Sequence, residues 1–207
     1  MNLARFLCLA FFCITTVAAC DWWNGPKQVK SEATLKRAYW GLPADGLGAD
    51  VTGRVTCPHG YPCDAFANPA NYGDNKPDLN KRLTVIWTCQ PQRFVLSEVV
   101  VSGLKVRMDC IGGPPVVPRT IEIIDATWGS GSASSTIDVT QQVRDICGAD
   151  STRCQVPAMA YIFGMPDRNA KMLRVRFTCN GQTTPGQQAL ENSVADLRCE
   201  RLADLGY

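Results

Sequence analysis

The sequence predicts a β-rich α+β fold made of two tandem, small, disulfide-bonded β-sandwich-like domains with short helices. Three observations predict it. Several short segments alternate apolar and polar residues as half-buried strands do, a set of motifs occurs twice in the same order, and the part of the chain that carries these motifs contains eight cysteines. The chain has 207 residues, of which 45% are hydrophobic and 19% charged, and this supplies enough apolar material for a core.

The first residues predict an export signal that does not belong to the fold. Arg5 supplies one positive charge, and the apolar run at 6–17 is too short to span a membrane. The run ends in Val17-Ala-Ala-Cys20, which resembles the bacterial lipobox. Residues 1–19 are therefore predicted to be a signal peptide and Cys20 the lipidated first residue, which makes the protein an exported, membrane-anchored lipoprotein facing the periplasm or the cell surface. Ordinary cleavage of a secreted protein at this small-residue site is the alternative.

The same motifs recur along the chain with offsets of 88 to 91 residues, which predicts a tandem duplication. Each unit contains Ala-x-Trp-Gly, Asp-Val-Thr, a cysteine pair, an aromatic residue followed by glycine, and a strand that begins with lysine and ends with cysteine. The corresponding segments are 38–41 and 126–129, 50–52 and 138–140, 57–63 and 147–154, 72–73 and 163–164, and 81–89 and 171–179.

Alternating residues predict the strands of both units, at 81–89, 94–101, 104–110 and 171–179. Unit 1 is placed at 27–110 and unit 2 at 120–207, separated by a linker at 111–119 whose prolines and glycines cannot continue a central strand. In unit 2, Val143 and Ile146 predict a short helix after Asp138, and Leu190, Val194 and Leu197 predict a second helix within 188–204. The segment 181–186 is predicted to be a loop.

The cysteine count favours disulfides. Of eleven cysteines, two lie in the signal and one is the lipidation candidate, so an even number remains for an oxidising compartment. Equivalent pairs in the two units, with five or six intervening residues, do not have the spacing of zinc ligands and are predicted to be disulfides. These are Cys57 with Cys63 and Cys147 with Cys154. The remaining four allow the symmetric pairing Cys89–Cys110 and Cys179–Cys199, or a bond between Cys110 and Cys179.

Charge and catalytic residues exclude several function classes. Without Arg5 the chain carries 20 basic and 19 acidic residues and no basic block, so a nucleic-acid partner is not expected. The one histidine, His59, lies in a cysteine loop and has no counterpart in unit 2. No phosphate-binding glycine loop, nucleophile elbow or metalloprotease motif is present, so the sequence predicts a protein without catalytic activity and implies no cofactor or metal.

The order of the motifs resembles the rhamnose/galactose-binding lectin domain of the sea-urchin-egg-lectin type, over residues 38–89 and 121–179. The resemblance implies a compact, disulfide-bonded β-rich domain in which an aspartate after the glycine and the lysine before the last strand hold sugar hydroxyls. The chain departs from that pattern in three ways: Met165 stands at the aspartate position of unit 2, the upstream glutamate has no clear counterpart, and each unit has fewer cysteines than the animal lectins.

Carried over to this chain, the resemblance gives six candidate sugar-binding residues: Tyr39, Asp74, Asn75, Lys81, Asp167 and Lys171. The chemistry is coherent, because vicinal hydroxyls pair with a carboxylate acceptor and an ammonium donor while an aromatic face covers the apolar side of the ring. The alternative is structural: each lysine only solvates a strand edge, Asp74 only stabilises a turn, and the aromatic residues belong to the core.

Two functions follow from the sequence. The first is a non-catalytic, lectin-like carbohydrate-binding protein of the bacterial envelope, for a rhamnose- or galactose-like sugar, with two sites that could gain avidity on a polymeric glycan. The second is a disulfide-stabilised protein-binding or structural envelope lipoprotein, such as an inhibitor or an assembly subunit. The first requires Lys81, Asp74 and a tyrosine or tryptophan face to converge on one exposed, concave spot.

Overall fold

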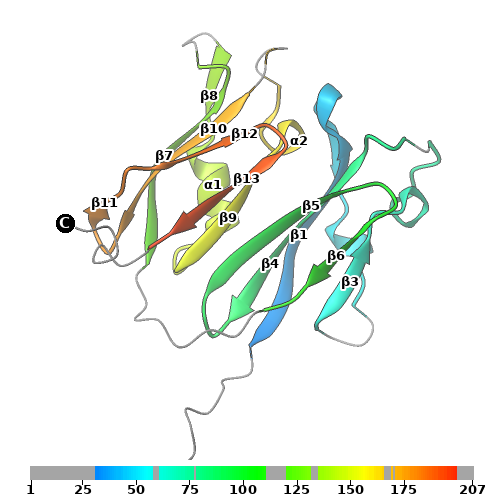
Figure 1. Cartoon of the computed structure of the whole chain (residues 1–207), viewed down its shortest axis with the longest axis horizontal. Helices are drawn as coiled ribbons and strands as arrows, with labels where there is room; N and C mark the ends of the chain where they lie inside the picture. The colour runs from blue at the N-terminus through cyan, green and yellow to red at the C-terminus, as the bar shows by residue number, and fades with distance from the viewer. Residues whose placement is uncertain are drawn as a thin grey trace, which may run out of the picture.

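The structure is a computed structural model that describes residues 31–57, 61–76, 78–110, 120–131, 135–165, 169 and 171–199. The predicted signal peptide, Cys20 and the linker lie outside the described residues. Antiparallel strands dominate the chain and form two sheets and a separate two-stranded ribbon, with only short helices between them (Figure 1). None of the described helices is long and apolar enough to cross a membrane. The fold is therefore β-rich with small sandwich-like units, as the alternating segments predict.

Unit 1 contains a four-stranded antiparallel sheet and a two-stranded ribbon. The sheet has the order β5-β4-β1-β2, and the ribbon pairs β3 with β6. The strands are β1 (Glu32–Leu42), β2 (Leu47–Asp50), β3 (Cys63–Phe66), β4 (Arg82–Gln90), β5 (Phe94–Val101) and β6 (Lys105–Met108). Three 3-10 turns, η3 (Pro43–Asp45), η4 (Thr52–Arg54) and η5 (Pro69–Tyr72), connect them.

Unit 2 repeats this pairing strand for strand. Its sheet has the order β12-β10-β7-β8, with β11 beside β12 on β10, and its ribbon pairs β9 with β13. The strands are β7 (Ile121–Gly129), β8 (Thr136–Asp138), β9 (Arg153–Ala158), β10 (Met172–Cys179), β11 (Gln182–Thr183), β12 (Gln187–Leu190) and β13 (Ser193–Arg198). Helices α1 (Thr140–Cys147) and α2 (Ala160–Phe163) take the places of η4 and η5. Lys36 in β1 and Ile124 in β7 form bulges at equivalent positions.

The repeated Trp-Gly pair is explained by packing on both sides of one strand. Trp40 and Trp128 are buried in the cores of units 1 and 2. At Gly41, an added Cβ would lie 2.5 Å from the carbonyl oxygen of Leu47, so the following strand crosses where only glycine fits. The interpretation that Trp40 and Trp128 belong to the core is therefore confirmed.

The two units join through a parallel strand pair. Strand β9 of unit 2 pairs with β5 of unit 1 at Phe94–Arg153 and Val95–Cys154, which extends the sheet of unit 1 to the six-stranded order β13-β9-β5-β4-β1-β2. In Figure 1, β9, β13 and α1 lie between the remaining strands of unit 2 and the sheet of unit 1. Across this junction the ammonium of Lys36 donates to the carbonyl oxygen of Ile146, 2.7 Å away, at the end of α1.

The central strand of unit 1 is buried on both faces because unit 2 covers its outer side. In β4, Leu83 and Val85 face the core of unit 1, whereas Ile86, fully buried, belongs to the core of unit 2. The hydroxyl of Thr84 forms a hydrogen bond with Tyr161 of α2. A continuous apolar run of this kind is typical of strands covered on both faces.

The residues that join the two units are not repeated at the equivalent positions of the other unit. The positions in β10 that correspond to Thr84 and Ile86 are Arg174 and Arg176, so the outer face of the unit 2 sheet is polar. The position in unit 1 that corresponds to Arg153 is Pro62, which has no backbone N–H to donate to another strand.

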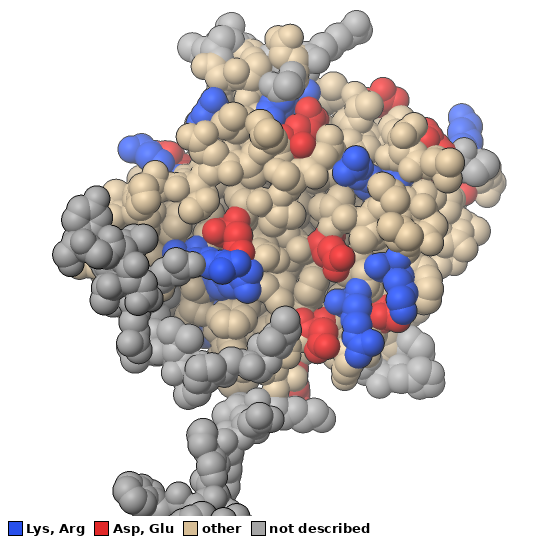
Figure 2. Space-filling view, in the orientation of Figure 1, with Lys and Arg blue, Asp and Glu red and all other residues tan. Residues whose placement is uncertain are grey.

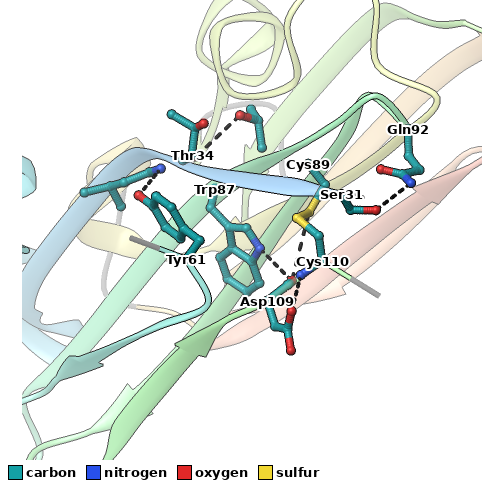
Figure 3. The surroundings of a disulfide bond; sticks show 10 residues. Ser31, Thr34, Tyr61, Trp87, Cys89, Gln92, Asp109 and Cys110 are labelled. Carbon is teal, nitrogen blue, oxygen red and sulfur yellow. Dashed lines mark hydrogen bonds between the residues drawn. A yellow bond between two sulfur atoms is a disulfide. The ribbon is translucent and has the colours of Figure 1, made fainter. Parts of the chain in front are cut away.

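Four disulfides hold the two units. Cys57–Cys63 and Cys147–Cys154 confirm the prediction from the equivalent pairs, and the other two bonds are the symmetric alternative, Cys89–Cys110 and Cys179–Cys199. Around Cys89–Cys110, the indole of Trp87 donates to the carbonyl oxygen of Asp109, 3.1 Å away (Figure 3). Each long-loop disulfide thus ties the end of the lysine strand to the end of the ribbon.

The predicted C-terminal helix is wrong. Residues 187–190 and 193–198 form β12 and β13, and residues 200–207 lie outside the described part. Val194 and Leu197 are three residues apart, as in a helix, but Ala195 and Leu197 are the buried residues and Asp196 lies between them, which is strand alternation. Pairing with β9, which is distant in sequence, decides between the two patterns. The predicted helix after Asp138 is confirmed as α1, and the predicted loop at 181–186 contains β11.

Candidate functional site

The two residues that the lysine motif singles out in unit 1 meet in the structure. Asp74 follows η5, where Gly73 adopts a left-handed conformation (φ +71°), and Lys81 directly precedes β4. The ammonium of Lys81 forms an ion pair with the Asp74 carboxylate and also donates to the carbonyl oxygen of Lys76, 3.1 Å away. The side chains of Lys81 and Asp74 remain 16% and 20% exposed. The pair is thus fixed in place and partly open to solvent.

Trp40 holds the carboxylate from the core side. Its indole Nε1 donates to Asp74 Oδ2 at 2.8 Å, while the backbone N–H of Lys76 donates to Oδ1 at 3.0 Å. Trp40 itself is 4% exposed and packs against Tyr72, with ring centroids 5.3 Å apart. Hydrogen bonds from Lys81, Trp40 and the Lys76 N–H lower the pKa of Asp74 to about 2, so this carboxylate is ionised throughout the physiological range.

The pKa of Asp74 gives a testable pH dependence. Because its folded-state pKa of about 2 lies below the ordinary value of 3.8, ionised Asp74 stabilises the fold fully above about pH 4. That contribution is lost as the pH falls towards 2. We expect the difference in unfolding free energy between the wild type and Asp74→Asn to shrink over this window in urea titrations at pH 2 to 6. A difference that stays constant with pH would contradict the assigned ion pair.

A second carboxylate titrates in the same window and serves as an internal comparison. Burial disfavours the ionised form of Asp196, but hydrogen bonds from Arg153 and Arg198 outweigh it and lower the pKa of Asp196 to about 2. The total stability of the wild type is therefore expected to fall further below pH 4 than Asp74 alone explains. Only the part of this pH-dependent loss of stability that disappears in Asp74→Asn is due to the candidate site.

A hollow of about 280 Å³ lies near the backbone of Lys81, although neither Lys81 nor Asp74 is among the residues that line it. The N–H of Ser102, which lines the hollow, donates to the carbonyl oxygen of Lys81 at 2.9 Å, and Asn71, which also lines it, lies three residues before Asp74 in the chain. The hollow is lined by Phe66, Ala67, Asn68, Pro69, Asn71, Ser102, Gly103 and Leu104. Phe66 and Leu104 are 54% and 56% exposed, so the hollow has exposed apolar side chains in its lining.

The corresponding end of unit 2 does not form an open site. Lys171 is only 2% exposed, its ammonium donates to the carbonyl oxygen of Asn169 at 3.1 Å, and a carboxylate oxygen of Glu191 lies 3.8 Å away. The indole of Trp128 donates to the carbonyl oxygen of Gly164 at 2.9 Å, because no aspartate follows that glycine. Lys171 is thus not presented to a ligand, and Asp167 lies outside the described residues.

Unit 2 uses this end to contact unit 1. Tyr161 in α2 packs so closely on Gly48 of unit 1 that a Cβ there would lie 2.6 Å from it, and Met165 lies against Gly46. The structural equivalent of α2 in unit 1 is η5, which carries the wall of the hollow. The duplication therefore leaves one such end free and places the other in the junction, and the sequence-based expectation of two equivalent sites finds no support in this arrangement.

Tyr39 is separate from the cluster. Its side chain points to the opposite face of β1 from that of Trp40. It is half-buried near Tyr161 of unit 2, with ring centroids 6.5 Å apart. Tyr39 therefore belongs to the junction, and its assignment to the site of unit 1 is corrected. Asn75 is exposed next to Asp74 and stays a candidate. Neither Tyr39 nor the buried Trp40 presents the aromatic face that the sequence interpretation requires at the pair, and the exposed aromatic residue of the hollow is Phe66.

Sequence reasoning missed the residues of the hollow. Residues 66–71 read Phe-Ala-Asn-Pro-Ala-Asn, whereas the corresponding residues 157–162 of unit 2 read Pro-Ala-Met-Ala-Tyr-Ile. Comparison of the two units would have shown amides and an aromatic residue in one unit where the other has mainly apolar residues. That contrast is the signal that distinguishes the open end from the junction.

A second, more polar hollow of about 540 Å³ lies along α1 and β7 and includes Asp125 and Asp138. Both carboxylates have partners, because Asp125 pairs with Arg176 and Asp138 Oδ1 accepts the N–H of Thr140 at 2.8 Å. Within the described residues, no group of three or more histidine, cysteine or carboxylate side chains is placed to hold a metal ion. On the face in Figure 2, acidic and basic side chains are interspersed. The end of unit 1 is therefore the stronger candidate.

Comparisons with protein-family models, with curated proteins and with solved structures find no match to this chain. The candidate site therefore rests on its geometry: an ion pair held by a buried indole, and a small hollow with an exposed aromatic wall near the backbone of Lys81.

Proposed function

We propose that this protein is a non-catalytic, lectin-like carbohydrate-binding protein with one site, at the end of unit 1. The observation that carries the proposal is the fixed and partly exposed Lys81–Asp74 pair, whose lysine carbonyl is hydrogen-bonded to the wall of the hollow that Phe66 also lines. Asn75 and Asn71 add exposed amides at the same end. Lectin-like binding in the sense of the sequence resemblance, with a rhamnose- or galactose-like ligand as the first expectation, fits this arrangement.

The chemistry of the pair suits sugar hydroxyls. A hydroxyl both donates and accepts, so one hydroxyl can donate to the Asp74 carboxylate while a neighbouring one accepts from the Lys81 ammonium. Because its pKa is lowered, the Asp74 carboxylate stays ionised and accepts hydrogen bonds at any physiological pH. The indole of Trp40 and the Lys76 backbone fix the carboxylate in one orientation, which reduces the ordering cost on binding.

The proposal includes export and a lipid anchor at Cys20, and the strand order fits such an attachment. Strand β1 begins opposite the end of β4, where Glu32 pairs with Gln90, and finishes beside the start of β4, where Gly41 pairs with Arg82. Lys81 and the hollow lie at the second end. The chain would thus enter the fold roughly 30 Å from the site, the length of a strand of this size, and the site would face away from the membrane.

The test is calorimetric titration of the soluble chain from residue 21 onward with a panel of monosaccharide glycosides. We expect binding that Phe66→Ala weakens by about tenfold, equal to about 1.4 kcal/mol, because an exposed aromatic face is lost. The matched control is Leu190→Ala, which removes another exposed apolar side chain, from unit 2 (63% exposed, against 54% for Phe66), and should leave binding unchanged. Equal loss in both variants, or no binding of any sugar, would contradict the proposal.

One observation favours a second function, a protein-binding module of the envelope. Val101 is 39% exposed and lies close in sequence to Leu104, so an apolar patch surrounds the hollow. If no sugar binds, Phe66→Ala should instead reduce recovery of one defined envelope protein in a cross-linking experiment, and Leu190→Ala should not.

A further inference from the structure

We infer that the hollow of unit 1 receives the acetamido group of an N-acetylated sugar, so that the ligand is an N-acetylhexosamine. The inference rests on the proposed carbohydrate-binding function and specifies its ligand class. It assigns the polar contacts of the ring hydroxyls to Lys81 and Asp74 and the contacts of the ring substituent to the hollow.

The lining of the hollow is neutral, since none of its eight residues is ionisable. One cation stands at its edge: the ammonium of Lys105 lies 6.0 Å from the centroid of the Phe66 ring. That ammonium is paired with the carboxylate of Asp64, 2.6 Å away, and Lys81 is paired with Asp74. A charged substituent would therefore enter the hollow without an unpaired counter-ion, which is unfavourable. The group that fits is uncharged.

The walls of the hollow are largely apolar. Phe66 and Leu104 lie on two of its sides, and Ala67 and Pro69 complete the surface. An acetyl methyl group would lose contact with water on entering, and each buried methyl or methylene contributes about 0.8 kcal/mol. A hydroxyl group in the same place would gain nothing from these walls. The apolar surface thus favours a substituent that carries a methyl group.

The side-chain polar groups of the hollow are the carboxamides of Asn68 and Asn71 and the hydroxyl of Ser102. The backbone is already satisfied, since the N–H of Gly103 donates to the carbonyl oxygen of Ala67 and the N–H of Ala67 donates to that of Leu104, both at 2.8 Å. Asn68 uses its Oδ1 to accept the N–H of Ala70 at 3.1 Å, which leaves its amino group available. Asn71 is exposed and can both donate and accept. An acetamido group offers the complementary carbonyl and N–H.

The fold does not require amides at these positions. The residues of unit 2 that correspond to Asn68 and Asn71 are Met159 and Ile162, and the same turn forms there as α2. Met159 is fully buried, so its position accepts an apolar side chain without loss of the turn. Asn68 caps η5 with its carboxamide oxygen, so the groups left to serve a ligand are its amino group and the carboxamide of Asn71.

The size of the hollow limits what enters it. Its volume of about 280 Å³ lies just below the range of about 300 to 1,000 Å³ of pockets for drug-sized ligands. One sugar substituent with part of its ring fits, whereas an extended oligosaccharide must lie outside. We therefore expect recognition of one N-acetylated sugar unit within a longer glycan.

The test compares sugars that differ only in the acetamido group. The soluble chain is titrated with the methyl glycosides of N-acetylgalactosamine and galactose, and of N-acetylglucosamine and glucose. We expect at least one N-acetylated sugar to bind about tenfold more tightly than its parent. In saturation-transfer NMR spectra its acetyl methyl protons should show the strongest transfer, because they contact the walls of the hollow.

The variant Asn71→Ala should abolish the preference for the N-acetylated sugar while retaining the weaker binding of the parent sugar. Gln188→Ala, an exposed amide of β12 in unit 2, is the control and should leave both affinities unchanged. Equal affinity for N-acetylated and parent sugars would overturn the inference and leave the proposed function standing. A preference that survives in Asn71→Ala would overturn the assignment to the hollow, and failure of every sugar to bind would overturn both proposals.

Discussion

Replacement of Ile86 by arginine is expected to destabilise the whole protein by about 4 kcal/mol or more, because it places an unpaired charge in a buried site. Ile86 is fully buried although it lies on the outer face of the unit 1 sheet, where it contributes to the core of unit 2. The change copies the residue that unit 2 has at the equivalent position, Arg176. The fold of a separate unit 1 would tolerate it, whereas the joined structure does not.

The matched control is the reverse change, Arg176→Ile. Arg176 is an exposed side chain of β10 that pairs with Asp125, and exposed ion pairs contribute about 0 to 1 kcal/mol. We therefore expect urea denaturation, followed by circular dichroism, to show a large decrease in the free energy of unfolding for Ile86→Arg and a small decrease for Arg176→Ile. The wild type should unfold in a single transition, since one core includes residues of both units. Similar small losses in both variants would mean that the units do not pack as described.

Replacement of Trp40 by phenylalanine is expected to reduce both stability and ligand affinity, whereas the same change at Trp128 should reduce stability alone. Each change deletes a buried indole N–H and leaves a small cavity, at a cost of about 2 kcal/mol. The partners differ: Trp40 donates to the Asp74 carboxylate and Trp128 to the carbonyl oxygen of Gly164. Only the first contact orients a residue of the candidate site, so Trp40 acts as a positioning residue.

The measurement pairs thermal unfolding with sugar titration on both variants. We expect Trp40→Phe to lower sugar affinity by about tenfold, and Trp128→Phe to leave it within about twofold of the wild type. Trp40→Phe should also move the acid titration of Asp74 towards its ordinary pKa, because one of three hydrogen bonds to the carboxylate is gone. An unchanged affinity in Trp40→Phe would remove the Asp74 carboxylate from the binding site.

Much of the fold could be predicted from local patterns. The strands at 81–89, 94–101 and 171–179 follow from alternation, and α1 follows from apolar residues three apart after a polar turn. The symmetric disulfides follow from the repeat, once the second ribbon strand is recognised. Residues 104–110 and 193–199 both alternate and both end in cysteine, which indicates the second ribbon strand. The spacing of Leu190, Val194 and Leu197 is helical by coincidence, and the equivalence of the two units is the more reliable signal there.

The site was predicted only in part. Lys81 and Asp74 are close, because the lysine begins a strand and the aspartate ends a turn that leads back towards it. Tyr39 was misplaced because neighbouring residues of a strand point to opposite faces, and the sequence does not show which face unit 2 covers. Lys171 and Lys81 are equivalent in the repeated motif, and the sequence does not show that the junction separates their environments. Packing between units, and not the motif, sets their different exposure.

The sequence by itself determined the duplication, the strand pattern of each unit, the two short-loop disulfides and the lysine that reaches the aspartate. These features depend on neighbours within a few residues or on direct comparison of the two units. Only the tertiary structure decided that β9 would pair with β5, that Ile86 would be buried from outside, and that one end would remain open. The physical reason is that these contacts join surfaces about 60 residues apart in the chain, and their stabilisation comes from burying both faces of one sheet.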